Sequence, residues 1–405
     1  MPQTQQARPL VSVIMANYQA GHRIAHALKS VLEQTVTDIE VIASDDASGD
    51  DSVALVREAM AKDGRIKLIV ADRNGGPAGA RNRALDMAQG EWIAIVDSDD
   101  IIHHERFERL LAAAEHFGAD VVADDLLHFH EDGAPVSFLL GEEQRTPFAV
   151  TPQSWIVAGI RPGTAPLGYL KPMIRANTLG ALRYDEAVRI GEDYDLMLRV
   201  LLKGARFHVV PEPWYLYRRH SGSISYRLSV GDVAAMIENQ KRLVASQGPF
   251  NASVQAALDE RMEGLVASYR FEHLVAAIKQ RDLGGTLKSL ATNPALIGPL
   301  WRSFREGRSR RAQPGTVTER NTASELQLTG AVERSSSAYL VPPYIPVTAI
   351  DWTRSSQRQT WKEIADLASG GRVKVLREDE AARYAAGFIP GARLDLETRA
   401  GVPAQ

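Results

Sequence analysis

Apolar runs alternate with amphipathic stretches over the first third of the chain. The apolar runs span residues 10–18, 39–46, 65–73, 92–100 and 119–129. Between them, apolar side chains recur at the spacing of a helix over residues 22–34, 51–62, 79–89 and 106–118. A continuous apolar run is typical of a strand that is buried on both faces. Its alternation with helices predicts an α/β fold with a mostly parallel sheet flanked by helices.

The later part of the chain follows a different pattern. Residues 131–175 contain several Pro and Gly and predict loops with little regular structure, whereas residues 189–207 predict a loop that leads into a helix. Residues 207–225 have the pattern of a strand, a turn and a second strand. Helical periodicity returns over residues 230–294 and predicts a C-terminal helical region.

The composition narrows the class of protein. Of the 405 residues, 44% are hydrophobic and 24% are charged, which is typical of a globular protein, and the net charge of −3 does not favour nucleic acid as a partner. The chain has no cysteine, which excludes disulfides, thiolate metal sites and a cysteine nucleophile. The first apolar run stops at Asn17 and suits a strand better than a signal peptide, and no apolar stretch is long enough to span a bilayer. We therefore expect a soluble cytoplasmic protein.

Polar side chains follow the predicted strands where each strand ends. Asn17 and Tyr18 follow the first strand, Asp45 and Asp46 the second, and the sequence Asp-Ser-Asp-Asp at residues 97–100 the fourth. The carboxyl ends of parallel strands meet at one edge of a sheet, and ligands of such sheets bind there. These side chains are therefore candidates for one shared site.

The acidic run at residues 97–100 has two interpretations. Carboxylates held close together cost free energy unless a cation lies between them or one of them takes up a proton. Hard divalent cations prefer oxygen ligands and often bridge protein carboxylates to substrate phosphates, a task that suits Asp97 and Asp99. Alternatively, Asp99 or Asp100 caps the helix that follows.

Three further motifs have both a functional and a plain structural interpretation. Asp45 or Asp46 can accept a hydrogen bond from a nucleobase, although turn chemistry explains the residues that follow. Arg81 lies at a glycine-rich helix start, where backbone N–H groups and a guanidinium can face anionic oxygens. Glu192 and Asp193 stand at the head of another helix, where the helix dipole alone favours acids.

Taken together and in this order, the segments resemble the family 2 inverting glycosyltransferases of the GT-A fold. The resemblance covers roughly the first 225 residues and rests on VSVIMANYQA, QTVTDIEVIASDDASGDDS, NGGPAGARNRALDMAQGEWIAIVDSDD and IGEDYDLMLRVLLKGARFHVVPEPWYLYRRHSGSIS. A narrower similarity, to the succinoglycan-type exopolysaccharide glycosyltransferases, extends to about Arg302. It rests on GYLKPMIRANTLGALRYDEAVRIGEDYDLMLRV and the helical FEHLVAAIKQRDLGGTLKSL.

The resemblance implies a donor-binding role for the side chains at the first two strand ends. Tyr18 would stack on the base of a nucleotide sugar, and Asp46 would bind the N–H edge of that base, with Asp45 beside it. Arg81 would lie near the ribose or the phosphates. Ala16 belongs to the same implied donor-binding set.

The resemblance also implies a metal site and a general base. Asp97 would contact the ribose and sometimes the metal, Ser98 would belong to the donor-binding set, and Asp99 would hold Mg²⁺ or Mn²⁺ on the diphosphate. Asp193 would be the general base, with Glu192 beside it.

Histidines add an open question about the metal. Many GT-A enzymes take a later histidine as a metal ligand, and His220 could serve or could equally be a loop residue. We expect His103 and His104 to be exposed residues at a helix start.

The implied reaction moves a sugar, with inversion, from a nucleotide diphosphate sugar to an acceptor. UDP-glucose is the donor that the resemblance favours, and the acceptor would be a glycan or a lipid-linked oligosaccharide in surface or exopolysaccharide biosynthesis. The competing classes are a nucleotidyltransferase acting on sugar phosphates, a nicotinamide dehydrogenase and a non-catalytic nucleotide-sugar or glycan-binding protein. The first two usually carry a glycine-rich loop directly after the first strand, where this chain has ANYQAGHRI. The third would be expected to lack Asp99 or Asp193.

The same reading divides the chain into four expected parts. These are a GT-A domain at 1–228, a helical region at 229–305, a linker at 306–337 and a C-terminal segment of unassigned role at 338–405. The segment WRSFREGRSRR at residues 301–311 carries five arginines and one acid. Basic residues and a tryptophan favour an anionic membrane surface, so we expect peripheral contact with the cytoplasmic face of the inner membrane, a solvated charged linker being the alternative.

Overall fold

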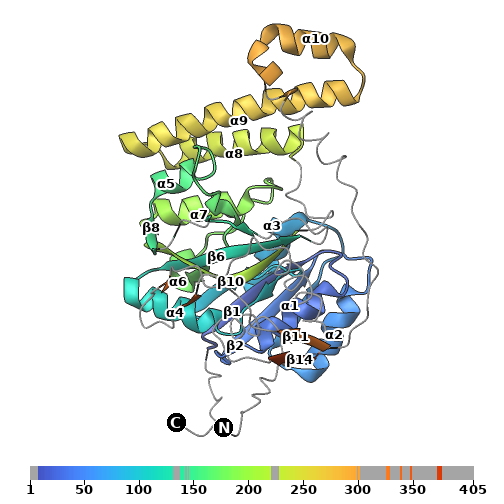
Figure 1. Ribbon diagram of the computed structural model, residues 1–405, viewed down its shortest axis with the longest axis vertical. Coiled ribbons are helices and arrows are strands. Elements are labelled where there is room, and N and C mark those ends of the chain that lie inside the picture. Colours follow the sequence, from blue (N-terminus) through green and yellow to red (C-terminus); the bar gives the residue numbers. More distant parts are fainter. Residues whose placement is uncertain are drawn as a thin grey trace, which may run out of the picture.

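The computed structural model describes residues 8–130, 137–141, 144, 146–219, 228–298, 300 and 301, together with four short strands between residues 325 and 375. Its centre is a ten-stranded sheet in which eight strands follow the order β3-β2-β1-β4-β9-β6-β10-β5, while β7 pairs with β6 and β8 with β10 (Figure 1). The longest ladders of this sheet are parallel. The expected α/β architecture, a mostly parallel sheet flanked by helices, is confirmed.

The parallel N-terminal part of the sheet comes from the alternating pattern. Its strands are β1 (Val11–Asn17), β2 (Ile39–Asp45), β3 (Ile66–Val70) and β4 (Trp92–Ile95). The helices that connect them are α1 (Arg23–Leu32), α2 (Ser52–Lys62) and α3 (Gly76–Met87). Every residue of β2 and of β4 is buried. Burial on both faces is the reason that the sequence shows continuous apolar runs rather than alternation.

A short antiparallel strand, β9 (Met173–Arg175), lies between β4 and β6 (Val121–His130) and joins the two parts of the sheet. The prediction of loops over residues 131–175 is wrong here. That segment also forms β7 (Ser137–Phe138), β8 (Phe148–Val150), α5 (Pro152–Val157) and the 3₁₀ turn η1 (Leu167–Tyr169). Elements of two to six residues are too short to show a hydrophobic period.

The strand β10 (Phe207–Arg219) is continuous over 13 residues, so the prediction of a strand, a turn and a second strand is wrong. It runs parallel to β6 with a register shift between Val210 and Tyr215, where residues 211–214 lie opposite Asp125 alone. Pro211 and Pro213 cannot donate to a ladder, which suggested a turn. A bulge accommodates both prolines without ending the strand.

The acidic run at 97–100 is separated from the next helix by a strand that the pattern did not predict. This strand, β5 (Ile101–Ile102), pairs antiparallel with Tyr215 and Leu216 of β10. Only after β5 does α4 (Arg106–Phe117) begin. The acidic run therefore lies against the late part of β10.

Further helices follow β9 along the chain. They are α6 (Ala176–Leu179), α7 (Glu192–Leu202), α8 (Val230–Gln247), α9 (Ala252–Lys279), α10 (Leu283–Thr292) and the 3₁₀ turn η3 (Pro294–Leu296). α8 and α9 lie side by side over α5 and α7, and α10 folds back on the far end of α9 (Figure 1). Ser229 and Asp232 form a capping box that starts α8, and Asn251 caps α9. The expected C-terminal helical region is confirmed.

Among the helices of the described ranges, none combines the length and the apolarity that crossing a bilayer requires. The residues from 302 onward lie outside the described residues except for four short strands. β11 (Glu325–Leu328) pairs with β14 (Arg372–Val375), and β12 (Ala338–Tyr339) pairs with β13 (Val347–Thr348). The linker at 306–337, the segment at 338–405 and the other expected boundaries remain predictions.

Candidate active site at the carboxyl edge of the sheet

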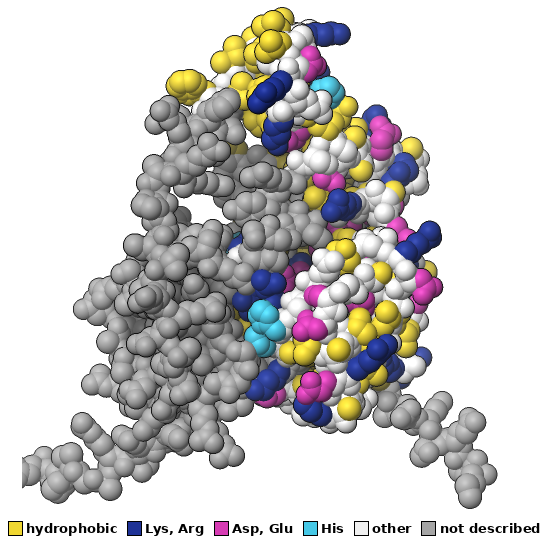
Figure 2. All heavy atoms as spheres, turned by 90° about the vertical axis from the view of Figure 1, so that its right-hand side faces the viewer, with side chains coloured by type: hydrophobic (Ala, Val, Ile, Leu, Met, Phe, Trp, Pro, Cys, Tyr) yellow, Lys and Arg dark blue, Asp and Glu magenta, His cyan; other side chains and the backbone are white. Residues whose placement is uncertain are grey.

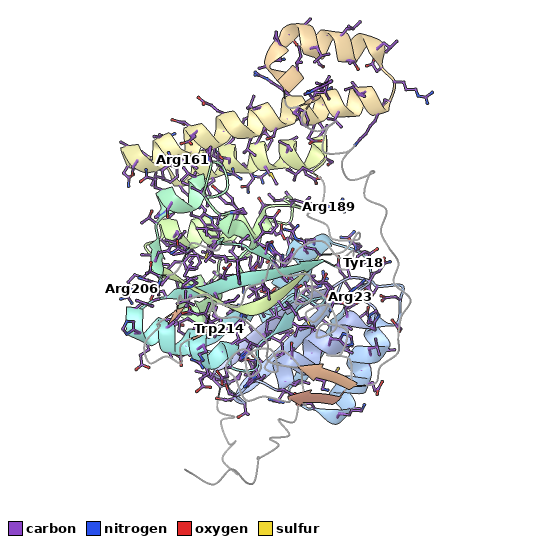
Figure 3. All side chains as sticks on the ribbon, in the orientation of Figure 1. Tyr18, Arg23, Arg161, Arg189, Arg206 and Trp214 are labelled. Carbon is purple, nitrogen blue, oxygen red and sulfur yellow. The ribbon has the colours of Figure 1, made fainter. Side chains whose placement is uncertain are left out.

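The carboxyl ends of β1 and β2 meet, because the parallel register sets Asn17 opposite Asp45 and Ala16 opposite Ser44. The Asn17 side-chain amide donates to Asp45 Oδ1 at 2.6 Å. Tyr18, the next residue, is 47% exposed, and Figure 3 shows it at this edge of the molecule. An exposed aromatic ring above a polar strand end offers a flat surface on which a planar ligand can stack.

Backbone donors hold both acids at the end of β2. Asp45 accepts the Ser48 N–H at 2.9 Å. Asp46 accepts the N–H groups of Gly75 at 3.0 Å and Gly76 at 2.7 Å, and it pairs with Arg83 at 2.7 Å. Turn chemistry thus accounts for much of what these acids do, as the plain interpretation expected. Asp46 also ties β2 to the glycine-rich start of α3, where Gly76 has φ +81°, a conformation that favours glycine.

Arg81 is the centre of a buried cluster of charges. Its Nη2 lies 3.1 Å from Asp97 Oδ1, while its Nη1 lies 2.7 Å from Glu192 Oε1 and 3.5 Å from Asp193 Oδ1. Lys171 joins the same cluster, with its ammonium 2.7 Å from Asp97 Oδ2 and 3.6 Å from Asp193 Oδ2. The structure therefore brings together the end of β4, α3, the start of α7 and the residue before Pro172, segments that are far apart in the sequence.

The two cations control the charge state of the cluster. Burial alone would raise the pKa of Asp97, but Lys171 and Arg81 outweigh it and hold that pKa below its usual range. Burial would also lower the pKa of Lys171, but Asp97 and Asp193 raise it above its usual range. Burial and the neighbouring Asp193 raise the pKa of Glu192, against the opposing effect of Arg81. The cluster keeps Asp97 and Lys171 charged, while Glu192 holds its proton more tightly than an ordinary glutamate does.

The start of α7 orients the two acids. Gly191 precedes the helix with φ 91°, and both acids lie in its first turn. The Glu192 side chain is 9% exposed and that of Asp193 is 22% exposed. Favourable placement on the helix dipole explains acids at this position in general. The helix dipole does not explain why both acids also pair with Arg81. The first turn of α7 therefore belongs to the charge cluster.

The remaining acids of the run lie beside the cluster. Ser98 and Asp100 are buried and Asp99 is partly exposed. Asp100 Oδ1 accepts the Arg218 N–H at 2.7 Å, and the Arg218 Nε donates to the Asp99 carbonyl at 2.8 Å. The first residue before α4 is Glu105, which makes no side-chain cap. The alternative that Asp99 or Asp100 caps that helix is therefore wrong, because β5 separates them from it.

One acid at this strand end, Asp100, has an oxygen that a divalent cation could use. Burial, and the charges of Asp99 and Asp97, raise the pKa of Asp100 well above its usual range. Its Oδ2 is buried without a hydrogen-bond partner among the described residues. A raised pKa favours the neutral acid, whereas Mg²⁺ and Mn²⁺ bind the ionised carboxylate, so a cation here would have to displace the proton of Asp100. No group of three or more acids and histidines within the described ranges forms a complete metal site, and His220 lies outside them.

The expectation for His103 is wrong, whereas that for His104 agrees with the structure. His103 is only 4% exposed, its N–H donates to the Trp214 carbonyl at 2.9 Å, and its carbonyl accepts Gln34 Nε2 at 2.7 Å. His104 keeps a side chain that is 41% exposed. The unpredicted pairing of β5 with β10 buries the residue that directly follows β5.

Sequence patterns missed Lys171 and the two tyrosines around the cluster. Lys171 occurs within the stretch that carries the narrower resemblance, but nothing in its local pattern indicates a charge partner. The Tyr184 ring lies 5.4 Å from the Arg81 guanidinium carbon, and the Tyr217 ring lies 5.8 Å from the Lys171 ammonium. Asn82 exchanges hydrogen bonds of 3.0 and 2.9 Å with the Tyr184 backbone and so fixes this loop on α3.

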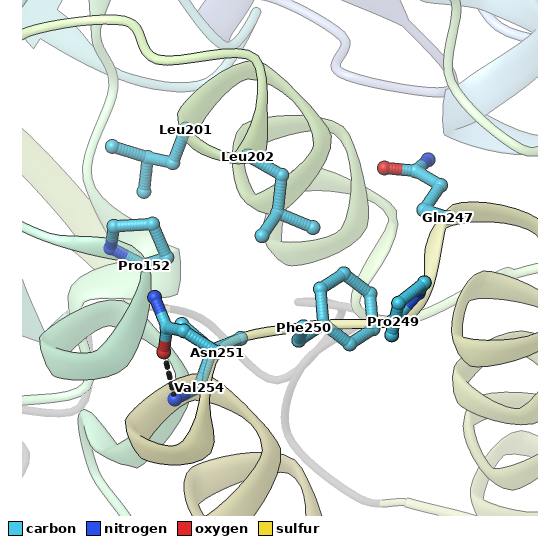
Figure 4. A pocket seen from close by; sticks show the side chains of 8 residues that line it. All are labelled: Pro152, Leu201, Leu202, Gln247, Pro249, Phe250, Asn251 and Val254. Carbon is cyan, nitrogen blue, oxygen red and sulfur yellow. Dashed lines mark hydrogen bonds between the residues drawn. The ribbon is translucent and has the colours of Figure 1, made fainter.

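A separate cavity of about 290 Å³ lies at the opposite end of α7 (Figure 4). Its lining residues are Pro152, Leu201, Leu202, Gln247, Pro249, Phe250, Asn251 and Val254. The 11 residues of α7 span about 16 Å between this cavity and the acids at the head of the helix. The cavity is therefore not part of the candidate active site.

Comparisons with known proteins agree with this geometry. The model of the family "Glycosyl transferase family 2" matches residues 12–150. The chain is 33% identical over 338 residues to the succinoglycan biosynthesis protein ExoO of Rhizobium meliloti strain 1021. The aligned region covers 81% of this chain and 94% of ExoO. The chain is 47% identical over 92 residues to the Escherichia coli UDP-Glc:alpha-D-GlcNAc-diphosphoundecaprenol beta-1,3-glucosyltransferase WfgD, which covers 23% of this chain and 36% of WfgD.

A solved structure resembles the fold. Residues 1–349 of S. aureus TarS, in complex with UDP-GlcNAc, superpose with a TM-score of 0.55 at 22% identity, covering 69% of this chain and 79% of that one. This likeness supports the expected GT-A fold. The extent of the match to ExoO, together with the family model, shows that the chain belongs to glycosyl transferase family 2.

Proposed function

We propose that this protein transfers a sugar, with inversion of configuration, from a nucleotide diphosphate sugar to a hydroxyl of a glycan or lipid-linked oligosaccharide in surface or exopolysaccharide biosynthesis. The observation that carries the proposal is the Arg81–Asp97–Lys171–Asp193 cluster, at the same edge of the sheet as the exposed Tyr18. Its two cations suit the ribose or the phosphates of a donor, and its partly exposed carboxylate, Asp193, suits an acceptor hydroxyl. The succinoglycan role of ExoO supports the exopolysaccharide assignment.

The donor would lie across the ends of β1, β2 and β4. Tyr18 stacks on the base, with Ala16, Asp45 and Asp46 around it. Arg81, Asp97 and Ser98 face the ribose and the phosphates. UDP-glucose is the favoured donor, and the name of WfgD, which specifies UDP-Glc, supports this choice. The preference for UDP is consistent with the TarS complex, whose ligand is UDP-GlcNAc.

Asp193 would act as the general base. Its carboxylate is partly exposed and can accept the proton of an acceptor hydroxyl, while Arg81 at 3.5 Å and Lys171 at 3.6 Å hold it in place. Glu192 is more buried and is paired with Arg81 at 2.7 Å, so it suits the task of positioning Asp193. Attack from the face opposite the nucleotide breaks the bond to the anomeric carbon, and the leaving diphosphate departs with the bonding electrons.

The acids Asp99 and Asp97 would hold Mg²⁺ or Mn²⁺, with His220 as a further candidate ligand and Asp100 beside them. When bound, the metal neutralises charge that develops on the leaving diphosphate.

We also propose that the protein works in the cytoplasm, at the cytoplasmic face of the inner membrane.

The test is a panel of nucleotide sugars with and without a glycan acceptor, followed by analysis of the released nucleotide. Acceptor-dependent release of nucleoside diphosphate is expected. Release of pyrophosphate from a sugar phosphate and a nucleoside triphosphate would indicate a nucleotidyltransferase instead. Tight binding of a nucleotide sugar with no turnover across the panel would indicate a non-catalytic binding protein.

A further inference from the structure

The α9–α10 tip, residues 279–301, carries the four most exposed large hydrophobic side chains of the described residues. Leu283 is 76% exposed, Leu287 69%, Ile297 57% and Trp301 67%. Every other exposed large hydrophobic side chain of the described ranges is less than half exposed. Single exposed apolar residues are normal on a soluble surface, but a group of large ones indicates a binding surface.

The fold of the tip explains why these side chains face outward. α10 has no buried residue, although it folds back on α9, where Leu274 and Ala277 are buried. Leu283 and Leu287 are one helical turn apart and therefore share one face of α10. At 76% and 69% exposed, they leave most of their surface outside the contact with α9. These two side chains therefore add little to the core of the protein.

The charge of the tip is positive. Lys279, Arg281 and Lys288 are exposed, and the acid Asp282 is engaged in capping α10, where it accepts the Gly285 N–H at 2.9 Å. Five further arginines follow Trp301 in the sequence within residues 302–311, against one acid. Figure 2 shows this end of the molecule, with apolar side chains gathered at the top and Lys and Arg side chains among them.

We propose that the α9–α10 tip docks the protein on an anionic lipid surface. Apolar side chains enter the interface between headgroups and acyl chains, while Lys and Arg remain among the phosphates. A second copy of the chain fits the tip less well, because two such tips would bring like charges together. The proposal does not depend on the reaction that the enzyme catalyses. It adds an apolar anchor to the membrane contact expected of the five arginines within residues 302–311.

The test is sedimentation of the full-length protein with vesicles of phosphatidylcholine and phosphatidylglycerol, compared with vesicles of phosphatidylcholine alone. The tip variant carries Leu283→Gln, Leu287→Gln, Ile297→Gln and Trp301→Gln. A matched control carries Val70→Thr, Met87→Gln and Ile160→Gln, which change exposed apolar side chains elsewhere. Since the four tip side chains are exposed, the tip variant should fold, and circular dichroism checks this.

Wild type and control should sediment with the anionic vesicles, and the tip variant should bind them at least about tenfold more weakly. Binding of the wild type should also fall as salt rises, because salt screens the basic residues. Equal binding by the tip variant and the wild type would overturn the proposal. So would a wild type that stays in the supernatant with anionic vesicles at low salt.

Light scattering after size-exclusion chromatography tests the alternative that a second copy of the chain binds the tip. If the wild type is an oligomer that does not bind vesicles, and the tip variant is a monomer, the tip is a contact between copies and the proposal is overturned. Sugar transfer to a soluble acceptor is measured separately in the absence of vesicles. If the wild type binds vesicles but transfers no sugar, only the proposed reaction is refuted. If it transfers sugar but does not bind vesicles, only the docking surface is refuted.

Discussion

Lys171 joins the end of β4 to the start of α7: its ammonium lies 2.7 Å from Asp97 Oδ2 and 3.6 Å from Asp193 Oδ2. A buried ion pair in turn holds the backbone of Lys171 in place. The Lys171 carbonyl accepts Arg106 Nη2 at 2.5 Å, and Arg106 forms a fully buried ion pair with Asp124 at 2.7 Å. One lysine therefore sets the separation between a proposed donor-binding acid and the proposed general base.

Replacing Lys171 should reduce turnover without preventing folding. In Lys171→Met, Arg81 still pairs with Asp97, so the cluster keeps one cation, but Asp193 loses a neighbour that positions it. A misplacement of about 1 Å at a reacting group can cost about 10² in rate, and we expect a fall in kcat approaching that size. Lys171→Arg should recover part of the rate. A Met variant with the kcat of the wild type would contradict this role.

The two acids at the head of α7 should differ in their effects. Asp193→Asn should lower kcat by about 10² to 10⁴, the usual contribution of general-base catalysis, and should change donor binding little. Glu192→Gln should cost less, because Glu192 acts through Arg81 and Asp193. Steady-state kinetics and equilibrium donor binding measure both effects. A larger loss in Glu192→Gln than in Asp193→Asn would reverse the two assignments.

Turnover should depend on a divalent cation. Excess chelator should stop transfer, added Mn²⁺ or Mg²⁺ should restore it, and Asp99→Ala should remove most activity while the protein stays folded. Glu115→Ala, which removes an exposed acid on α4, serves as the control and should behave as the wild type. Full activity in excess chelator would refute the metal requirement.

Glu212 should make stability depend on pH. Burial, and the nearby Asp124, raise its pKa from 4.5 to about 7 in the folded protein. The folded state therefore keeps a proton that the unfolded state has lost, and unfolding releases it between these two values. The free energy of unfolding should fall as pH rises through this range and level off above it.

The variant Glu212→Gln removes this titration. Between about pH 4.5 and about pH 8, the wild type should lose about 3 kcal/mol more unfolding free energy than the variant does. Denaturant titrations at several pH values measure the difference, and Glu115→Gln is again the control. Parallel pH profiles for the wild type and Glu212→Gln would show that the buried carboxyl does not control this dependence.

Local patterns in the sequence determined the parallel part of the sheet and the C-terminal helices. The run at residues 39–46 became β2, and the helical pattern that begins at residue 230 became α8 and the helices after it. Such elements are specified by the spacing of neighbouring apolar residues and by caps such as Ser229, so they can be read from a short window. The same reasoning placed Tyr18, Asp46 and Asp97 at one edge, because the ends of parallel strands meet there.

Only the tertiary structure decided which of these side chains share a cluster and what surrounds them. The short strand β9 carries no periodic signal, yet its insertion between β4 and β6 brings Lys171 to Asp97. The pairing of β5 with β10 buries His103 and keeps Asp99 and Asp100 from capping α4. These outcomes depend on contacts between residues far apart in the chain. Their energies come from burial and charge pairing in the folded molecule, and no local pattern of apolar and polar residues records them.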